Sequence, residues 1–255
     1  MRDPYDLFAR TYDAWQSGYP KPFAEAVLPF YEREIERYGV PETSMAELAC
    51  GTGTFLCAWA RRHRGWILMG SDQSAGMLRA ARWKLRAAGL TAKLLRQRLQ
   101  KVALPRPAGL AVCVFDSINH LTRSSDLHRS LRAIARSLLP GALLVFDTND
   151  ERAFGRIFTG TWTVDTEGLH VAVAASASDD ETFGTLGFRI FERRKGNCWR
   201  RTDITIRERN WRSCEVVEAL DAAGLDLLRV RRIQPYPPDQ VEAPRSLWVC
   251  RRKES

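Results

Sequence analysis

The sequence has no long apolar run, no cysteine pair spaced as in a metal site, and little lysine. No apolar run approaches the ~18 residues that a membrane-spanning helix needs, so we expect no membrane contact. The six cysteines are scattered without a CxxC pattern, which favours buried, reduced thiols over metal ligands. The first ten residues lack the basic start and apolar core of a secretory signal. We therefore expect a cytoplasmic protein without a metal site.

Lysine is scarce although the chain is basic. Only six of the 39 basic residues are lysines, and the formal net charge is +9. The arginines occur as scattered pairs, such as Arg61-Arg62 and Arg251-Arg252, rather than as one long run. The aromatic-plus-basic pattern of a dedicated RNA module is also missing. This distribution disfavours a nucleic-acid partner but leaves it open.

Segment 45–55, MAELACGTGTF, has the pattern of a strand that runs into a glycine turn. Its apolar part ends at Cys50, and Gly51 and Gly53 follow before a helical pattern begins. Because glycine has no Cβ, both positions allow a tight turn and a close approach of a ligand. The helix that begins near Thr54 would point free N–H groups at that ligand, where a carboxylate or phosphate is stabilised.

A second apolar run, residues 66–71, ends at Asp72. This order of elements is the layout of a nucleoside-cofactor site in a doubly wound sheet: a strand, a glycine turn, a helix, a second strand and an acid. Asp72 can accept the hydrogens of both ribose hydroxyl groups. A dinucleotide fingerprint would have a third glycine where Leu56 stands, so a nicotinamide dehydrogenase is disfavoured.

Glu47 in the first strand, followed by GTGT, resembles motif I of the class I S-adenosylmethionine-dependent methyltransferases. The resemblance implies that S-adenosylmethionine is the cofactor, with a carboxylate near its amino group, glycines under its methionine part and Asp72 on its ribose. Segments 77–81, 115–121 and 138–149 are similar to stretches of a bacterial group of these enzymes, many of which act on small molecules.

One departure from this bacterial group concerns the adenine of the cofactor. Members usually carry an acid after the third strand, in a QDM-like triplet, and this acid accepts a hydrogen bond from the adenine amine. Gln97-Arg98-Leu99 stands at the corresponding place, and arginine cannot accept a hydrogen bond. Either Gln97 and backbone atoms hold the adenine, or cofactor affinity is weak, or the chain no longer uses the cofactor.

Two side chains are predicted to act at the methyl acceptor, Tyr12 and His120. Tyr12-Asp13 resembles the YD pair of small-molecule N- and O-methyltransferases, although Tyr12 can equally be a core aromatic on an amphipathic helix. His120 suits a general base because its unperturbed pKa lies near neutrality, and it can also be structural. Asp116 can orient the ammonium group of the cofactor or the acceptor, or cap a turn. The predicted cofactor-binding residues are Tyr12, Glu47, Ala49, Cys50, Gly51, Thr52, Gly53, Asp72, Gln73, Met77, Gln97, Arg98, Leu99, Phe115 and Asp116.

The hydrophobic pattern predicts an N-terminal helical cover over residues 1–38 and then an α/β core. Core strands are predicted at 45–49, 66–71, 92–96, 110–115 and 142–147. Core helices are predicted at 54–63, 74–88 and 124–138. Three antiparallel strands follow at 161–176, 183–193 and 198–210. A helix at 211–223 and two strands at 225–233 and 246–251 end the pattern.

These elements predict a doubly wound, mainly parallel seven-stranded sheet of the Rossmann-like methyltransferase kind, with a small antiparallel sheet inserted at 161–210. The core would comprise 39–160 and 211–255, and the last two strands would form an antiparallel hairpin at one edge. The inserted sheet matches the antiparallel flap of the bacterial group and, with the N-terminal helices, would form the acceptor pocket. Trp162, Phe188 and Tyr236 are its predicted wall residues.

Methyl transfer from a sulfonium is an in-line displacement, so the protein mainly aligns donor and acceptor in a dry pocket. The sequence therefore predicts transfer to nitrogen or oxygen of a small-molecule acceptor, by a monomer or a homodimer. Two other readings stay open. One is a methyltransferase of nucleic acid or protein, which would need a basic face beside the cofactor mouth. The other is a binding protein on a methyltransferase scaffold, for which Arg98 is the best support.

Overall fold

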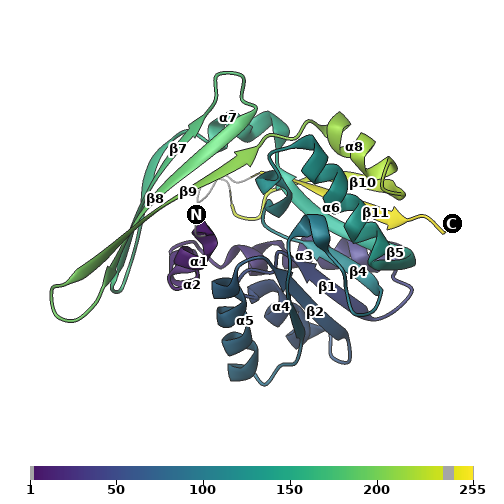
Figure 1. Cartoon of the computed structure of the whole chain (residues 1–255), viewed down its shortest axis with the longest axis horizontal. Coiled ribbons are helices and arrows are strands. Elements are labelled where there is room, and N and C mark those ends of the chain that lie inside the picture. Colours follow the sequence, from purple (N-terminus) through teal and green to yellow (C-terminus); the bar gives the residue numbers. More distant parts are fainter. Residues whose placement is uncertain (1–2, 238–243, 255) are drawn as a thin grey trace.

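The computed structural model describes residues 3–237 and 244–254, in two sheets with helices packed around one of them (Figure 1). Residues 1–2, 238–243 and 255, which fall within the predicted N-terminal cover and core, lie outside the described residues. The strands of the larger sheet are β1 (Ser44–Leu48), β2 (Ile67–Asp72), β3 (Lys93–Arg96), β4 (Ala108–Cys113), β5 (Leu138–Asn149), β10 (Leu225–Ile233) and β11 (Arg245–Arg252).

The larger sheet confirms the predicted seven-stranded, mainly parallel architecture. Its strand order is β10-β11-β5-β4-β1-β2-β3. Strand β1 lies parallel to both β2 and β4, and β5 lies parallel to β4. Strand β11 pairs antiparallel with β5 and with β10, so the last two strands form the predicted hairpin at one edge. The carboxyl ends of the central parallel strands therefore meet at one edge of the sheet, where ligands bind in such folds.

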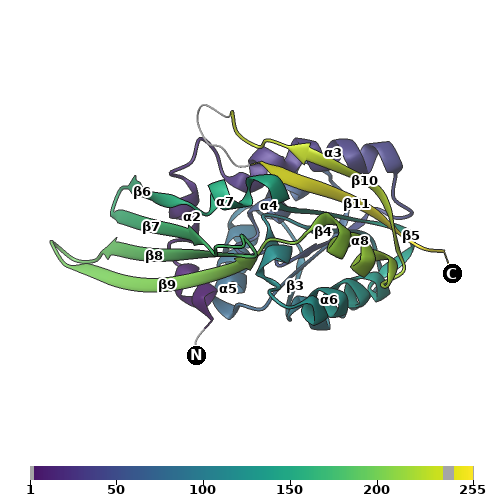
Figure 2. The ribbon, with the colours of Figure 1, turned by 90° about the horizontal axis from the view of Figure 1, so that it is seen from above.

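Helices cover both faces of this sheet (Figure 2). They are α3 (Phe23–Tyr38), α4 (Thr54–Arg62), α5 (Ala75–Ala87), α6 (Ser124–Arg136) and α8 (Ser213–Asp221). Alternate residues of one strand pack into different cores: Met45 of β1 joins the core under α3 and α4, whereas Ala46 joins the core under α6 and α8. Both faces of the central strands are thus buried, which explains their continuous apolar runs.

The smaller sheet, here called the flap sheet, is antiparallel and projects away from the main sheet (Figures 1 and 2). Its strands, in order across the sheet, are β6 (Gly160–Thr166), β7 (Leu169–Ala177), β8 (Phe183–Arg193) and β9 (Trp199–Arg209). The prediction of three strands was wrong, because segment 161–176 contains two strands joined at Glu167 and Gly168. Gly168 has a φ of +73°, which permits the tight turn. The alternation of apolar residues continues through this turn and conceals it.

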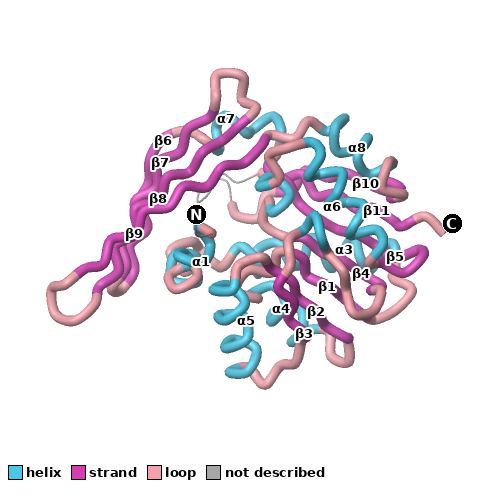
Figure 3. The backbone as a smooth tube through the Cα atoms, viewed as in Figure 1, coloured by secondary structure: helices cyan, strands magenta, loops and turns pink. Residues whose placement is uncertain are grey.

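Two short helices, α1 (Pro4–Phe8) and α2 (Tyr12–Gln16), lie between the flap sheet and α5 (Figure 3). Phe8 and Trp15 pack with Val171, Val173 and Phe188 on the inner face of the flap sheet. The N-terminal segment therefore fills the space between the two sheets. None of the helices in the described ranges combines the length and apolar composition that a membrane span requires.

The fifth core strand begins earlier than its sequence pattern suggests. Helix α6 ends at Arg136 rather than at 138, and β5 begins at Leu138. Pro140 and Gly141 lie inside β5, where the pairing with β4 shifts register between Ala108 and Leu110. Proline and glycine are tolerated there because a bulge leaves part of the ladder unpaired.

Candidate functional site

A cavity of about 630 Å³ lies at the carboxyl edge of the main sheet, between this edge, the helices α1 and α2, and the flap sheet. Every residue predicted to contact cofactor or acceptor lines this cavity, except Gly53 and Arg98. The predicted wall residues Trp162, Phe188 and Tyr236 line it as well. The fold thus brings together residues from eight separate parts of the chain, and their individual roles stay predictions.

The glycine turn has the strained backbone that its sequence predicts. Ala49, Gly51 and Gly53 have φ values of 54°, 51° and 73°. A Cβ at Gly53 would lie 3.1 Å from the Cβ of Ala81, so this glycine allows close packing of α4 against α5 and does not face the cavity. Gly51 lines the cavity and has no neighbour in the Cβ direction. Of the two glycines, Gly51 is therefore the one that a ligand can approach.

Glu47 is a buried carboxylate with one unpaired oxygen. The backbone N–H of Leu56, in the first turn of α4, donates to this side chain. Its Oε2 has no hydrogen-bond partner among the described residues, and Glu47 lines the cavity. Burial raises the pKa of Glu47 to about 8. A cationic group in the cavity would satisfy this oxygen and favour the ionised form.

Asp72 stands at the end of β2 and faces the glycine turn. The backbone N–H of Gly51 donates to its Oδ2 (2.9 Å), and that of Ser74 donates to its Oδ1 (2.8 Å). Each carboxylate oxygen keeps a further lone pair, so both can still accept a hydroxyl hydrogen. Burial raises the pKa of Asp72 to about 6.

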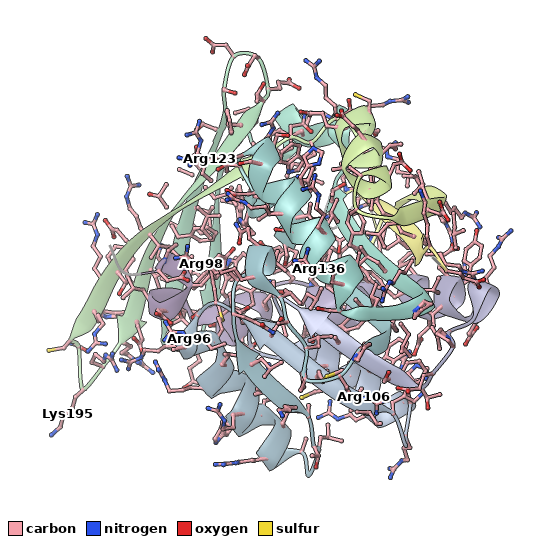
Figure 4. All side chains as sticks on the ribbon, turned by 45° about the vertical axis from the view of Figure 1, so that its right-hand side comes forward. Arg96, Arg98, Arg106, Arg123, Arg136 and Lys195 are labelled. Carbon is pink, nitrogen blue, oxygen red and sulfur yellow. The ribbon has the colours of Figure 1, made fainter. Side chains whose placement is uncertain are left out.

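The three residues at the predicted adenine position, Gln97-Arg98-Leu99, do not all face the cavity. Gln97 and Leu99 line the cavity, whereas Arg98 is exposed and outside the lining (Figure 4). The backbone N–H of Ala103 donates to Oε1 of Gln97 (3.0 Å), and the buried Nε2 of Gln97 has no partner among the described residues. Gln97 therefore offers a free donor to the cavity, and Arg98 puts no cation inside it.

The helices α1 and α2 are tied to the cofactor side of the cavity by two acids. Asp6 accepts hydrogen bonds from Oγ of Ser74 (2.6 Å) and from the backbone N–H of Gly76 (2.7 Å), and these bonds lower its pKa. Asp13 accepts a hydrogen bond from Oγ1 of Thr52 (2.6 Å) and pairs with Lys84 (2.9 Å). These contacts hold the α1–α2 segment, with Tyr12, against the glycine turn.

A second group of buried polar side chains lines the opposite part of the cavity. Asp116 pairs with Arg245 at 2.9 Å. Nδ2 of Asn149 lies 3.1 Å from Oδ2 of Asp116 and 2.7 Å from Oε2 of Glu208, and donates to both. All four residues line the cavity and are buried. The buried charges here are two carboxyl groups and one guanidinium.

The sequence pattern predicted only one residue of this polar cluster as a site residue. Asp116 was predicted, but Asn149, Glu208 and Arg245 were not. Glu208 lies on the same face of β9 as the inward-facing Ile204 and Ile206. A charged residue in this apolar alternation was the signal that could have identified it. Arg245 has no comparable signal, because only the fold places β11 beside β5.

The backbone at residues 115–116 is held in an unusual conformation by Asp147. Phe115 and Asp116 have φ values of 60° and 46°, a region that L residues rarely occupy. The N–H of Phe115 donates to Oδ1 of Asp147 (2.7 Å), and that of Asp116 donates to Oδ2 (3.0 Å). The hydroxyl of Tyr31 also donates to Asp147 (2.7 Å). Asp147 therefore fixes the direction of the Asp116 side chain.

His120 lies in the short 3-10 helix Ser117–His120, with its Nε2 3.0 Å from the hydroxyl of Tyr5. Burial lowers the pKa of His120, so the neutral imidazole is the favoured form. The cavity walls around these groups are aromatic. Ring pairs such as Phe23–Phe115 and Phe8–Tyr12 pack with centroids 4.3 and 5.1 Å apart. Such walls exclude water from the groups that they surround.

A basic face lies outside the cavity, on β3, α6 and the chain between them. Residues 93–136 contain nine lysines and arginines, all of them exposed, and two acids. This stretch therefore carries +7 of the net +9 of the chain. Figure 4 shows Arg96, Arg98, Arg123 and Arg136 from this face. Arg98 follows Gln97 directly, so the basic face begins beside the predicted adenine position.

The family model described as a methyltransferase domain matches residues 45–141. Two curated proteins with methyltransferase names are similar. The YqeM protein of Bacillus subtilis is 24% identical over 222 residues, which are 86% of this chain and 88% of that protein. A protein of Geobacillus sp. strain WCH70 is 26% identical over 148 residues, which are 58% of this chain and only 54% of the relative.

Solved structures show the same fold. A S-adenosylmethionine-dependent methyltransferase from Clostridium acetobutylicum has a TM-score of 0.79 at 21% identity, covering 98% of this chain and 100% of that chain. The sugar N-methyltransferase KedS8 from Streptoalloteichus has a TM-score of 0.74 at 23% identity, covering 95% of this chain and 93% of that chain. The likeness therefore includes both the main sheet and the flap sheet.

Proposed function

We propose that the chain, as a class I S-adenosylmethionine-dependent methyltransferase, methylates the nitrogen of a small-molecule amine held beneath the flap sheet. The observation that carries this proposal is the acceptor part of the cavity. Its walls are aromatic, and the ionisable side chains buried in it include the carboxyl groups of Asp116 and Glu208 and the guanidinium of Arg245. Arg156 also lines the cavity but is an exposed residue. Such an environment suits a compact cationic or neutral amine better than an extended or anionic acceptor.

The residues at the other end of the cavity fit the cofactor. The unpaired Oε2 of Glu47 suits its ammonium group, Asp72 suits the ribose, and the free Nε2 donor of Gln97 suits a ring nitrogen of the adenine. When bound, the cofactor supplies a methyl group on a sulfonium, already activated for displacement. The chain then has to align the acceptor, exclude water and receive a proton. Tyr12, between the two ends of the cavity, is proposed to contact both ligands.

A solved structure of similar fold supports a small-molecule acceptor. KedS8 is a sugar N-methyltransferase, and its fold matches this chain over 93% of its length. Transfer to a hydroxyl group is the variant that His120 would favour, since a neutral imidazole in the cavity can act as a base. Its hydrogen bond with Tyr5 gives it a structural role as well.

The experiment that tests the proposal is an acceptor screen that measures formation of S-adenosylhomocysteine. Matched amines and alcohols of the same carbon skeleton, such as benzylamine and benzyl alcohol, are incubated with the protein and S-adenosylmethionine. We expect turnover of amines that exceeds turnover of the matched alcohols. Turnover confined to alcohols would contradict the proposed acceptor atom, and absence of cofactor binding would contradict the whole proposal.

The basic face favours a second candidate, methylation of nucleic acid. Its nine exposed cations would contact phosphates, and binding would weaken steeply with salt. The test is the affinity of a short RNA at physiological salt for the wild type and for the triple variant Arg98→Glu, Arg132→Glu and Arg136→Glu. A matched control reverses Arg64, Arg82 and Arg86, which are exposed outside this face. Tight binding lost only in the first variant would favour this candidate; the small-molecule proposal predicts no tight binding.

A cytoplasmic location and a monomeric or homodimeric state stay predictions. The division of the chain into an N-terminal cover, a core and an inserted flap sheet also stays a prediction. The boundaries of the flap sheet move from 161–210 to Gly160–Arg209.

A further inference from the structure

We propose that Glu208, on the flap sheet, receives the proton that the acceptor amine must lose, with Asp116 as its partner and Asn149 as the residue that positions both. This inference rests on the proposed function and adds to it a residue that the motif pattern does not contain. It assigns a chemical role to the flap sheet, which would otherwise be only a cover over the cavity.

The first observation is where Glu208 lies. It lies on the inner face of β9, the same face as the buried Ile204 and Ile206, and is itself only 2% exposed. It lines the cavity beside Asp116, which comes from the carboxyl edge of the main sheet. A carboxyl group in an otherwise apolar row costs free energy unless it is paired, so its position needs a reason.

The second observation is the pairing. Nδ2 of Asn149 donates to one oxygen of Glu208 (2.7 Å) and one of Asp116 (3.1 Å), and the two carboxyl groups are hydrogen-bonded to each other. Two carboxyl groups this close share a proton, because both cannot be ionised at low cost. Burial and then the charge of Asp116 raise the pKa of Glu208. Asp116 pairs with Arg245, so the shared proton belongs on Glu208.

The groups that face Glu208 come from four other elements. They are Asp116 after β4, Arg245 on β11, Tyr5 on α1 and, as a neutral donor, Asn149 on β5. The guanidinium of Arg245 lies 2.9 Å from Asp116 and 3.9 Å from Asp147. One cation therefore faces three carboxyl groups. A second cation in the cavity, such as an ammonium group, would balance the charge of ionised Glu208.

His120 is a less suitable proton acceptor. Its Nε2 is engaged with the hydroxyl of Tyr5, and burial lowers its pKa, so protonation there is disfavoured. Glu208 has the opposite property, because burial favours its protonated form. A group that is stable with a proton is the better destination for the one that the acceptor loses.

One proton leaves the protein in each turnover. The acceptor enters as an ammonium ion, and the carboxyl pair releases its shared proton to solvent. One N–H bond of the ammonium breaks, an O–H bond forms on Glu208, and the electron pair stays on nitrogen. That pair forms the bond to the methyl carbon, while sulfur keeps the electrons of the bond that breaks. The methylated product leaves as an ammonium ion, and Glu208 keeps the proton that it received, which restores the starting state. The one proton released per turnover is therefore the shared proton that the carboxyl pair loses when the acceptor binds.

Binding calorimetry on the protein with S-adenosylhomocysteine bound tests the inference without requiring turnover. Benzylamine and cyclohexylamine are compared with benzyl alcohol and cyclohexanol, in two buffers of different ionisation enthalpy at pH 7. Because the proposal places the shared proton of the carboxyl pair on Glu208 in the free protein, amine binding is expected to release a proton. The amines are also expected to bind about tenfold or more tightly than the alcohols, as a charged hydrogen bond would give.

The diagnostic variant is Glu208→Gln, which copies the shape and neutrality of the protonated side chain and so preserves the fold. It should bind amines about 10–100-fold more weakly, without proton release, while binding S-adenosylhomocysteine as the wild type does. Glu218→Gln, an exposed glutamate on α8, is the matched control. Unchanged amine affinity and proton release in Glu208→Gln would overturn the inference. Amines that bind no better than alcohols to the wild type would overturn it too. Failure of the wild type to bind S-adenosylhomocysteine would refute the proposed function itself.

Discussion

Glu47 is expected to lose a proton when the cofactor binds. Its pKa of about 8 means that at pH 7 the carboxyl group of the free protein is about nine-tenths protonated. An ammonium group against the unpaired Oε2 favours the carboxylate. Binding should therefore release about 0.9 proton from Glu47 at pH 7, and only about 0.1 at pH 9, where the group is already ionised.

Glu47→Gln is the perturbation that isolates this proton. Titrations with S-adenosylhomocysteine at pH 7, in phosphate and in Tris, give the number of protons released from the difference in heat. The amino group of the ligand titrates equally in both proteins, so the difference between wild type and variant belongs to Glu47. The variant should also lose about 1.5–3 kcal/mol of binding free energy, or about 10–100-fold in affinity.

A matched control for this substitution is Glu36→Gln, since Glu36 is exposed on α3. It should release as many protons as the wild type and bind with the same affinity. Equal proton release from wild type and Glu47→Gln would refute the reasoning, because it would place the cofactor's ammonium group elsewhere in the cavity.

Three further outcomes are expected. Below about pH 6, protonation of Asp72 should add up to a further tenfold loss of cofactor affinity per pH unit to the loss that protonation of Glu47 causes; calorimetry on Asp72→Asn should show weak binding without this added dependence. Gln97→Ala should weaken cofactor binding because it removes the free Nε2 donor. Arg98→Ala should change the affinity by no more than about twofold, which is less than the loss of one hydrogen bond would cause. A titration in which Arg98→Ala weakens binding more than Gln97→Ala would contradict this assignment. Tyr31→Phe should lower the free energy of unfolding by about 1.5–3 kcal/mol in urea, because it removes a donor to buried Asp147, and an unchanged midpoint would count against this.

The cofactor end of the cavity was predictable because its residues are close in sequence. Gly51 and Asp72 stand at the ends of neighbouring strands, and a parallel sheet brings such ends together without further information. The same rule placed Phe115 and Asp116 in the cavity. What the pattern could not give was the direction of each side chain: Gly53 packs against Ala81, and Arg98 is exposed.

The acceptor end was less predictable because distant strands build it. Glu208 reaches Asn149 only because the flap sheet folds back over the edge of the main sheet. Arg245 reaches Asp116 only because β11 inserts between β5 and β10. The alternation of apolar residues reports which residues face inward, but it carries no information on which strand lies opposite. The turn at Gly168 was missed for the same reason, since the alternation continues across it.

The central claim is that this cavity binds S-adenosylmethionine through the glycine turn and Asp72. The most direct measurement is a calorimetric titration of the wild type and of Asp72→Ala with S-adenosylmethionine. The account predicts saturable one-to-one binding by the wild type, and loss of most of that affinity in a variant that remains folded by circular dichroism. Wild-type protein that gives no binding heat, or Asp72→Ala that binds as tightly as the wild type, would contradict it.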